Sequence, residues 1–481
     1  MKVICTISFL FLIRFYGSTQ SIINEKTILI DSILKASHDK EVFNGVVLVA
    51  DSGRVIYKKG FGVNDNMAQS PIKVDDRFYI GSMTKQFTSL LIYRLYEQGK
   101  LDINHSMTKY LPQFRGRLYK NITIHHLLTH TSGIGSYHTL TYFDKTKDYP
   151  SDQMIKMIKA RQPVFEAGTS YEYSNSGYYL LGKIIERCTK KSYGEVLEQE
   201  ILIPLGMSNT AYETTWLDDH VAKGYHMTVD GMADMPKYSL STLYASGGMY
   251  STVDDLYKWN EALYSDRLLS DSLKYIMFTP NQGDYASGWR VSRGIEDEVY
   301  YERHQHGGTI QGYHTFILRR IPQQQTVIVL DNFYNSEVQS IKNSIWSILE
   351  GREGWIPKSM LSSLLYKRIV EGKLTKSLEA ILANKSTYEY DYNFEEYNIN
   401  TVGYRLMELN RLDEAKQIFE FNLALFPGSW NVYDSLGEVY FRLGRLGDAS
   451  EMYQQSLRLN PKNESATNAI RSIKKLKKKV R

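Results

Sequence analysis

The sequence predicts an α+β (α/β) domain in which helices cover one sheet, followed by a separate all-α module. Three observations lead to this fold class. Strand-like runs occur over residues 44–62 and again over residues 287–330, and helical patterns fill much of the chain between them. Past residue 350 the chain is helix-rich, with abundant Leu, Glu and Lys. Strands at both ends with helices between them indicate one sheet assembled from both ends of the domain.

Residues 1–20 have the layout of a secretory signal peptide. Met1-Lys2 precedes an apolar stretch, Val3–Ile13, and small and polar residues follow near Gly17. The stretch is too short for a convincing membrane span. We therefore expect export to the periplasm or the exterior, with no transmembrane span once the signal is removed, and membrane association if the N-terminus stays uncleaved. The alternative is a buried first helix of a cytosolic protein.

The elements of the large domain, residues 21–350, follow in order. Residues 24–39 have helical spacing. Residues 44–62 alternate apolar and polar side chains around an Asp51-Ser52-Gly53 turn, which is typical of a β-hairpin. A long helical pattern begins at Ser82 and stops at Gly99. The remaining strand-like runs and the closing helix are predicted at residues 287–291, 313–318, 326–330 and 337–349.

A repeat with a spacing of 34 residues occurs near the C-terminus. It matches the tetratricopeptide pattern, which has small residues where two helices cross, large ones at the packing seam and Pro at the turn. The matched pairs are Gly403 and Gly437, Arg411 and Arg445, Leu412 and Leu446, Ala415 and Ala449, Phe419 and Tyr453, and Pro427 and Pro461. Residues 396–465 thus hold two units, preceded by a helical linker over residues 351–395.

Two repeats are fewer than the roughly three that solenoids need to bury a continuous core. We expect these two repeats to pack against the preceding helices or against the large domain. The matched positions are packing residues, so the module is expected to dock a protein partner or to stabilise the chain rather than to take part in catalysis.

The net charge of +5 comes from the C-terminal end of the chain. Residues 471–481 carry seven Lys and Arg and no acid, so the rest of the chain is close to neutral. Recognition of nucleic acid needs many cations on a folded face, so no nucleic-acid partner is expected. We interpret residues 466–481 as a basic tail that forms a solvated helix end; attraction to an anionic membrane surface is the alternative.

The tetrapeptide Ser82-Met83-Thr84-Lys85 places a hydroxyl and an amine three residues apart on one face of a helix. The serine stands at the helix start, where the helix dipole favours negative charge. The identical tetrapeptide Ser106-Met107-Thr108-Lys109 also occurs, but Pro112 prevents a helix from continuing there. The long helix after Ser82 therefore selects Ser82, and not Ser106, as the candidate nucleophile.

Tyr173 and Asn175 form the second element, between a turn at Gly168 and an amphipathic helix over residues 178–188. A phenol near an ammonium group can be shifted toward the phenolate, take the proton of a serine and return it to a leaving group. The amide of Asn175 could bond Lys85 and a substrate carbonyl. In a chain with 37 Tyr such a pair alone is more often turn chemistry, so its meaning depends on the other elements.

The third element is His306-Gly307-Gly308-Thr309, shortly before the strand predicted at residues 313–318. Glycines at such a place let a substrate backbone approach the edge of a sheet. The backbone N–H of Thr309 could pair with that of Ser82 to hold an oxyanion.

Together the three elements resemble the serine β-lactamase/penicillin-binding-protein superfamily. The resemblance is to its class C β-lactamase-like branch, which includes D-alanyl-D-alanine carboxypeptidases, D-amino-acid peptidases and family VIII esterases. Two linking segments, residues 124–133 and 247–256, share it, and it covers residues 25–350. It implies a β-lactamase/transpeptidase-like antiparallel sheet flanked by helices.

The resemblance also implies a role for each site residue. Ser82 would be the acylated nucleophile, Lys85 its proton partner, Tyr173 the general base and Asn175 a ligand of substrate and lysine. His306 would stand where β-lactamases of this branch have the Lys of Lys-Thr-Gly. Residues 307–309, Gly307, Gly308 and Thr309, would line the substrate and oxyanion site.

The histidine at position 306 departs from the family pattern. A neutral imidazole is a weaker anchor than an ammonium group for the carboxylate of a penicillin or a stem peptide. We therefore predict a serine hydrolase that cleaves an ester or amide in a small molecule or peptide, like a carboxylesterase or D-peptidase. The alternatives are β-lactamase or penicillin-binding activity, or a catalytically silent adaptor that works through its repeats.

Other histidines lie close together in the sequence, at positions 125, 126 and 130, and His304 is near His306. None of these spacings matches a metalloprotease motif. We interpret them as structural or hydrogen-bonding residues and expect neither a metal site nor a cofactor.

Overall fold

The computed structural model describes residues 23–479 except residues 66, 217–220 and 297–298. It divides into two compact units, which are described separately. One holds the chain up to His226 together with Asp234–Pro357, and the other holds Met227–Ala233 together with Lys358–Arg481. The predicted signal peptide lies outside the described residues. Within the described part of the chain, no helix combines the length and the apolar character that a membrane crossing requires.

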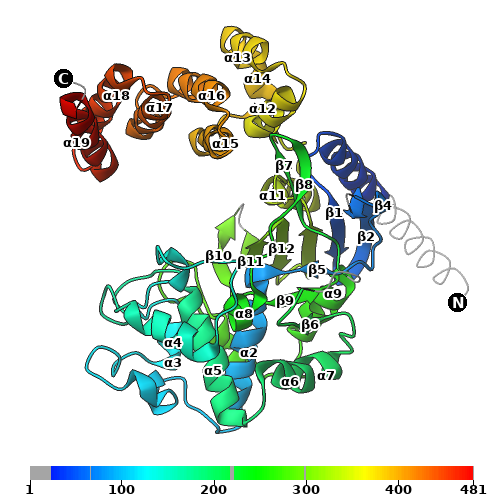
Figure 1. The fold of residues 1–481 in the computed structure, drawn as a ribbon. Helices are drawn as coiled ribbons and strands as arrows, with labels where there is room; N and C mark the ends of the chain where they lie inside the picture. The colour runs from blue at the N-terminus through cyan, green and yellow to red at the C-terminus, as the bar shows by residue number, and fades with distance from the viewer. Residues whose placement is uncertain (1–22, 66, 217–220, 297–298, 480–481) are drawn as a thin grey trace, which may run out of the picture. The chain divides into compact units, whose positions relative to one another are not determined.

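The first unit is built on a six-stranded antiparallel sheet with the order β10-β11-β12-β13-β1-β2 (Figure 1). Its strands are β1 Gly45–Asp51, β2 Arg54–Phe61, β10 Arg290–Glu296, β11 Val299–Ile310, β12 Tyr313–Arg320 and β13 Gln325–Asp331. Strand β1 from the start of the domain pairs with β13 from its end, with Val47 opposite Val329. The predicted sheet, assembled from both ends of the domain, is confirmed.

Both faces of the sheet are covered because the central strands are apolar on both sides. Val47 and Val49 of β1 pack with the helix at residues 23–39 and with α11, Val338–Leu349. Val46 and Leu48 point to the opposite face and pack in the main core, which includes α2, Thr84–Glu97. This alternation follows from the two-residue period of side chains along a strand.

The chain between β2 and β10 supplies the helical layer on that second face. Its helices are α2, α3 Ile124–Leu128, α4 Ser151–Ala160, α5 Asn175–Thr189, α6 Tyr193–Leu197, α7 Ile203–Leu205, α8 Leu240–Leu243, α9 Val253–Ala262 and α10 Asp271–Met277. Its 3-10 turns are η1 Gly81–Met83, η2 Met107–Lys109, η3 Pro112–Phe114, η4 Tyr137–Thr139 and η6 Tyr244–Ser246, and η5 Glu198–Leu202 is a π-helical turn. Helix α2 lies at the centre of this layer and is buried on nearly every side. Its position is further fixed by Trp259 of α9, whose Nε1 donates a 3.0 Å hydrogen bond to Gln86 Oε1.

Short strands complete the unit: β3 Val63–Asp65, β4 Ser70–Pro71, β5 Phe78–Tyr79, β6 Ala211–Tyr212 and β9 Met249–Ser251. Strands β7 Tyr225–Thr228 and β8 Gly231–Asp234 pair with each other, and their residues Met227–Ala233 belong to the second unit. Strands β5, β9 and β6 pair in that order, and β5 leads the chain into the turn before α2.

The structure differs from the prediction at two strands of the sheet. The run at residues 287–291 begins pairing only at Arg290, because Gly288 lies against α2: a Cβ there would be 2.7 Å from the carbonyl oxygen of Lys85. The long strand β11 was missed, since its polar and charged residues lack the apolar alternation that indicates a strand. This missed strand is the one that carries His306.

The second unit is helical, with a small parallel pair of strands, β14 Ser359–Met360 and β15 Tyr392–Asn393. Its helices are α12 Leu361–Val370, α13 Leu374–Ala383, α14 Lys385–Asp391, α15 Glu396–Glu408, α16 Leu412–Leu425, α17 Trp430–Arg442, α18 Leu446–Leu459 and α19 Glu464–Lys479. Gly403 of α15 packs against Phe419 of α16, and Gly437 of α17 packs against Tyr453 of α18. The same small-against-large contact thus recurs 34 residues later, as the repeat predicts.

The two repeats share one core with the helices on either side of them. Leu365 of α12 and Ile381 of α13 join it from the segment predicted as a linker, so this segment is part of the packed unit. Ala466 and Ile473 of α19 join it from the segment predicted as a basic tail. The apolar stripe of this helix closes the end of the repeat core, whereas residues 474–477 near its C-terminal end are exposed, as expected for a solvated helix end.

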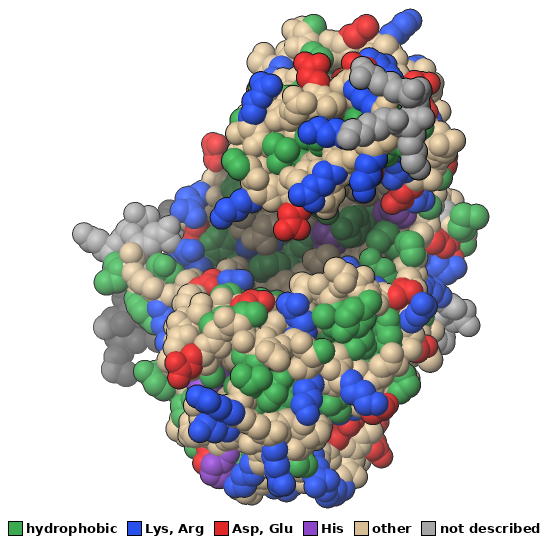
Figure 2. Space-filling model, turned by 60° about the vertical axis from the view of Figure 1, so that its left-hand side comes forward, with side chains coloured by type: hydrophobic (Ala, Val, Ile, Leu, Met, Phe, Trp, Pro, Cys, Tyr) green, Lys and Arg blue, Asp and Glu red, His purple; other side chains and the backbone are tan. Residues whose placement is uncertain are grey.

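Charged side chains are mixed over the face drawn in Figure 2, where Lys and Arg are interspersed with Asp and Glu. This face shows no broad surface of positive charge, in line with the near-neutral charge of the chain before residue 471.

Candidate active site

Ser82 is placed by a tight turn between strand β5 and helix α2. Gly81 has φ +52°, a value that favours glycine, and a Cβ at this position would lie 3.1 Å from the backbone nitrogen of Thr309. The turn therefore brings the nucleophile close to strand β11. Ser82 itself is half-buried, at the N-terminal end of α2.

Lys85 is fully buried in the first turn of α2. Its Nζ lies 3.0 Å from Ser82 Oγ and 2.7 Å from the carbonyl oxygen of Ser246. The rings of Tyr173 and Tyr178 also face it, with centroids 4.9 Å and 5.5 Å from Nζ. Burial holds the pKa of Lys85 well below its ordinary value, so the neutral amine is favoured.

The second tetrapeptide forms no such pair. Ser106 caps the short turn η2, where its Oγ accepts a hydrogen bond from the backbone N–H of Thr108. Lys109 is exposed, and its Nζ lies 3.0 Å from Nδ1 of His105. No long helix follows Ser106 within residues 107–123, all of which the structure describes, as the sequence predicts. Ser106 and Lys109 are therefore not held together.

Tyr173 faces Lys85 from the loop before α5, and its ring lies 4.2 Å from that of His130 and 6.4 Å from that of His306. Burial raises the pKa of Tyr173 above its ordinary value, and a hydrogen bond with Ser82 offsets only part of this rise. The expected shift toward phenolate is therefore reversed. Desolvation disfavours the charged forms of both Tyr173 and Lys85. The neutral phenol and the neutral amine are therefore the favoured forms of this pair.

Asn175 is the first residue of α5. Its buried Oδ1 has no hydrogen-bond partner among the described residues, and the expected bond to Lys85 is absent from that part of the chain. The residue before it, Ser174, donates a 3.0 Å backbone hydrogen bond to Nδ1 of His130. A buried amide oxygen without a protein partner is available to a substrate N–H or to water.

His306 is buried on strand β11 and is neutral. Its Nδ1 lies 2.7 Å from the carbonyl oxygen of Gly307, so Nδ1 carries the proton, and Nε2 then accepts a 3.1 Å hydrogen bond from Tyr285 Oη. Burial lowers the pKa of His306 to about 3. The residue therefore offers no fixed positive charge in place of the family's lysine.

The glycines of β11 permit close packing against the turn that carries Ser82. A Cβ on Gly308 would lie 1.9 Å from the carbonyl oxygen of Ile80, so only glycine fits. The pairing of β10 with β11 ends at Gln305, and residues 306–310 pair with β12 alone among the described strands. One edge of this stretch is thus free to pair with an extended substrate, with exposed Thr309 near its end.

Sequence reasoning missed the aromatic wall around Lys85. The ring of His130 lies tilted against those of Tyr173, Tyr178 and Tyr285, with centroids 4.2 Å, 5.1 Å and 4.6 Å away. His130 belongs to a segment that already carried the family resemblance, which was a usable signal. Tyr285 carried no sequence signal, because a single tyrosine in a tyrosine-rich chain is not distinctive. Its role becomes visible only when the fold places it beside His306.

Two of the remaining histidines have local hydrogen-bond partners. His126 Nδ1 accepts a 3.3 Å hydrogen bond from the backbone N–H of Thr123, and His304 Nε2 lies 2.7 Å from Glu302 Oε1. No group of three or more His, Cys, Asp or Glu in the described ranges is placed to hold a metal ion.

Comparison with known proteins matches this geometry to a family. Residues 30–342 match the family described as Beta-lactamase, and residues 430–463 match a tetratricopeptide repeat. Penicillin-binding protein 4* of Bacillus subtilis (strain 168) is 29% identical over 373 residues, which cover 71% of this chain and 81% of that protein. Protein flp of Staphylococcus aureus (strain COL) is 30% identical over 328 residues, 65% of this chain and 64% of that protein.

The solved structures include a D-stereospecific amidohydrolase from Streptomyces sp., which is 25% identical with a TM-score of 0.57. The match covers 66% of this chain and 98% of that one. The family match spans more than half of the sequence and contains all eight predicted site residues. The chain belongs to the beta-lactamase family of serine hydrolases, and tetratricopeptide repeats follow its family domain.

Proposed function

We propose that the protein hydrolyses an ester or amide through an acyl-enzyme on Ser82. The observation that carries this proposal is the 3.0 Å contact between Ser82 Oγ and the buried Nζ of Lys85. A serine hydroxyl is a weak nucleophile unless a base is within hydrogen-bond reach. Burial makes Lys85 such a base, because it favours the neutral amine with its free lone pair.

Acylation proceeds by transfer of one proton around three groups. Ser82 Oγ bonds to the substrate carbonyl carbon as its proton passes to Nζ of Lys85, which is held by the Ser246 carbonyl. The phenol of Tyr173 protonates the leaving group as the bond to that group breaks, and Lys85 then returns the proton to Tyr173. Water takes the place of the leaving group in deacylation, and the same transfers run in reverse to release the acid and restore Ser82.

The backbone N–H groups of Ser82 and Thr309 stabilise the negative charge that develops on the carbonyl oxygen. The close approach of Gly81 to Thr309 supports this assignment, since it draws the two backbones together. Fixed N–H donors aimed at that oxygen are often the largest single contribution to catalysis. The free edge of residues 306–310 would hold the substrate in extended form alongside them.

Esters and amides are favoured over β-lactams because His306 is neutral. A carboxylate beside the scissile bond would find no fixed cation at this position. The similarity to a D-stereospecific amidohydrolase supports amide substrates. Similarity to a penicillin-binding protein supports β-lactam acylation as a second candidate. We further propose export, on the leader-like residues 1–20, and docking of a protein partner by the repeats.

The test is covalent labelling of the full chain with a fluorophosphonate and, separately, with a penicillin. We expect one adduct, on Ser82, that is lost in Ser82→Ala and kept in the matched variant Ser106→Ala. Labelling by the penicillin as well would support the second candidate. Failure of both reagents to label a folded protein that also hydrolyses no ester would overturn the proposal and favour the silent adaptor.

A further inference from the structure

His130 is a buried residue with an unusual backbone conformation. Its φ is +57°, in the left-handed region that residues other than glycine seldom adopt, and the residue is 1% exposed. Backbone strain of this kind persists only where the surrounding contacts hold the residue in place. The contacts that hold His130 come from the loop that carries Tyr173.

His130 binds the backbone on both sides of Tyr173. Its carbonyl oxygen accepts a 3.0 Å hydrogen bond from the backbone N–H of Glu172. Its ring Nδ1 accepts a 3.0 Å hydrogen bond from the backbone N–H of Ser174. We call these two hydrogen bonds the clamp, because they fix the two chain neighbours of Tyr173 to one residue.

The ring of His130 also limits where the phenol can lie. Its centroid is 4.2 Å from that of Tyr173, and the two rings are tilted by 40°. On other sides it contacts the rings of Tyr178 and Tyr285. Tyr178 is itself fixed by a 2.8 Å hydrogen bond from its Oη to the Leu128 carbonyl. The imidazole is therefore a rigid support for Tyr173.

The clamp requires one form of the imidazole. A backbone N–H can only donate, so Nδ1 of His130 has no proton and the neutral ring carries its proton on Nε2. Nε2 has no hydrogen-bond partner in the described part of the chain. Burial holds the pKa of His130 well below its ordinary value, which keeps the ring neutral and its acceptor available to Ser174.

We propose that His130 is the positioning residue of Tyr173: its clamp sets the place and orientation from which the phenol protonates the leaving group. The inference rests on the proposed function. It gives His130 no contact with the substrate, so every effect of His130 on catalysis should pass through Tyr173 and depend on the leaving group.

The first test compares ethyl acetate with p-nitrophenyl acetate, which share one acyl group. His130→Phe keeps an aromatic ring but removes the acceptor, and we expect kcat to fall roughly tenfold or more with the ethyl ester, less with the p-nitrophenyl ester, and KM to change little. His130→Gly removes the acceptor without backbone strain and gives the same prediction if His130→Phe does not fold. Equal losses on both esters, or none, overturn the inference.

Rescue and a double-mutant cycle separate positioning from a general loss of structure. His130→Asn should recover most of the rate, because Asn tolerates a left-handed φ and its Oδ1 is an acceptor in place of Nδ1. Once Tyr173→Phe has removed the phenol, His130→Phe should cost less than about twofold more. Losses that multiply in the double variant would show that His130 acts independently of Tyr173 and overturn the inference.

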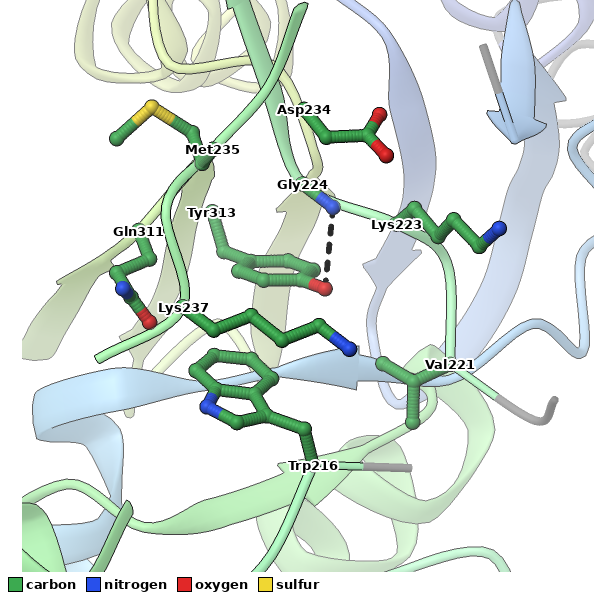
Figure 3. A pocket seen from close by; sticks show the side chains of 9 residues that line it. All are labelled: Trp216, Val221, Lys223, Gly224, Asp234, Met235, Lys237, Gln311 and Tyr313. Atoms are coloured by element: carbon green, nitrogen blue, oxygen red, sulfur yellow. Dashed lines mark hydrogen bonds between the residues drawn. The ribbon is translucent and has the colours of Figure 1, made fainter. Parts of the chain in front are cut away.

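Two controls lie outside the clamp. His125→Phe removes an imidazole from the same segment, and Nδ1 of His125 has no hydrogen-bond partner among the described residues. Met235→Ala changes a cavity of about 300 Å³ in the same unit, and the nine residues that line it include none of the clamp (Figure 3). Both variants should keep the wild-type ratio between the two esters.

Hydrogen exchange tests the clamp without turnover. In the full-length Ser82→Ala protein, mass spectrometry of a peptide that contains residues 172–174 reports the two clamped amides. We expect them to exchange roughly tenfold faster or more when His130→Phe is added, and to return toward the Ser82→Ala rate with His130→Asn. Unchanged exchange overturns the inference. If neither ester is hydrolysed, the proposed function fails, but the exchange still decides whether His130 holds the loop.

Discussion

Lys85 Nζ lies 3.0 Å from Ser82 Oγ, and both face the ring of Tyr173 inside an aromatic wall. Burial lowers the pKa of the amine and raises that of the phenol, so burial favours the neutral form of both groups. The direction of these two shifts supports the proposed roles, in which Lys85 accepts a proton and Tyr173 donates one. The alternative, a phenolate beside an ammonium, would place two charges where water is excluded.

Lys85→Arg should lower kcat/KM by roughly 10²- to 10⁴-fold, because a guanidinium group keeps its proton and cannot accept one from Ser82. Steady-state hydrolysis of p-nitrophenyl acetate measures the effect. The same change at the second tetrapeptide, Lys109→Arg, serves as the control and should leave the rate at the wild-type level. Retention of activity by Lys85→Arg would exclude the lysine as the base.

Tyr173→Phe should slow substrates in proportion to their need for a protonated leaving group. We expect a loss of roughly 10²-fold or more with an alkyl ester or anilide, and a smaller loss with a p-nitrophenyl ester, whose phenolate leaves without a proton. Tyr171→Phe, at a neighbouring phenol, should affect both substrates little. Equal losses on both substrates would show that Tyr173 acts on Ser82 rather than on the leaving group.

The pH profile of kcat/KM should have a rising limb that belongs to Lys85. Activity increases as pH rises through the lowered pKa of this amine, because only the deprotonated form accepts the serine proton. Tyr173 must keep its proton to act as a donor. Because the pKa of Tyr173 is raised, the phenol gives up that proton only above the ordinary pKa of about 10. A plateau that extends to about pH 10 is therefore expected. A falling limb between about pH 7 and about pH 9 would contradict the assignment of a neutral phenol.

The fold should lose stability in acid through its buried histidines. Burial lowers the pKa of His306 to about 3 and that of His304 to about 4, whereas in the unfolded chain both titrate near 6.5. The unfolded state therefore takes up protons first as pH falls below 6.5. The free energy of unfolding should then drop by up to roughly 1.4 kcal/mol per pH unit for each residue, until the folded-state pKa is reached.

Urea unfolding at a series of pH values tests this slope. His306→Gln should flatten it, because one group that titrates differently in the two states is removed. His105→Gln, at an exposed histidine, should keep the wild-type slope. A wild-type slope in His306→Gln would show that the residue is not protonated on unfolding in this range.

Gly308→Ala should damage the site by steric conflict. The added Cβ would lie 1.9 Å from the Ile80 carbonyl oxygen, so β11 must move away from the turn that carries Ser82. We expect a loss of about 1–3 kcal/mol in the free energy of unfolding and a fall in kcat. Gly194→Ala is the matched control, since its Cβ would make only an ordinary 3.4 Å contact with Tyr212. A Gly308→Ala protein with wild-type stability would show that β11 can move without cost.

The sequence alone determined the main architecture and the four residues from Ser82 to Lys85 that hold the nucleophile. Hairpin β1–β2, helix α2, strands β12 and β13, and the repeats all follow from apolar periodicity, turn residues and capping, which are local properties. The contrast between Ser82 and Ser106 was also readable, because a proline ends one helix pattern and not the other.

Only the tertiary structure decided the rest. Strand β11 lacks an apolar alternation and is a strand because β12 and β10 pair with it. The protonation states of Lys85, Tyr173 and His306 depend on burial among rings from distant segments. No spacing in the sequence indicates that Tyr285 hydrogen-bonds His306 or that Trp216 and Tyr313 line the same cavity. Such features depend on contacts between residues far apart in the chain, and burial, which sets the cost of charge, exists only once those contacts form.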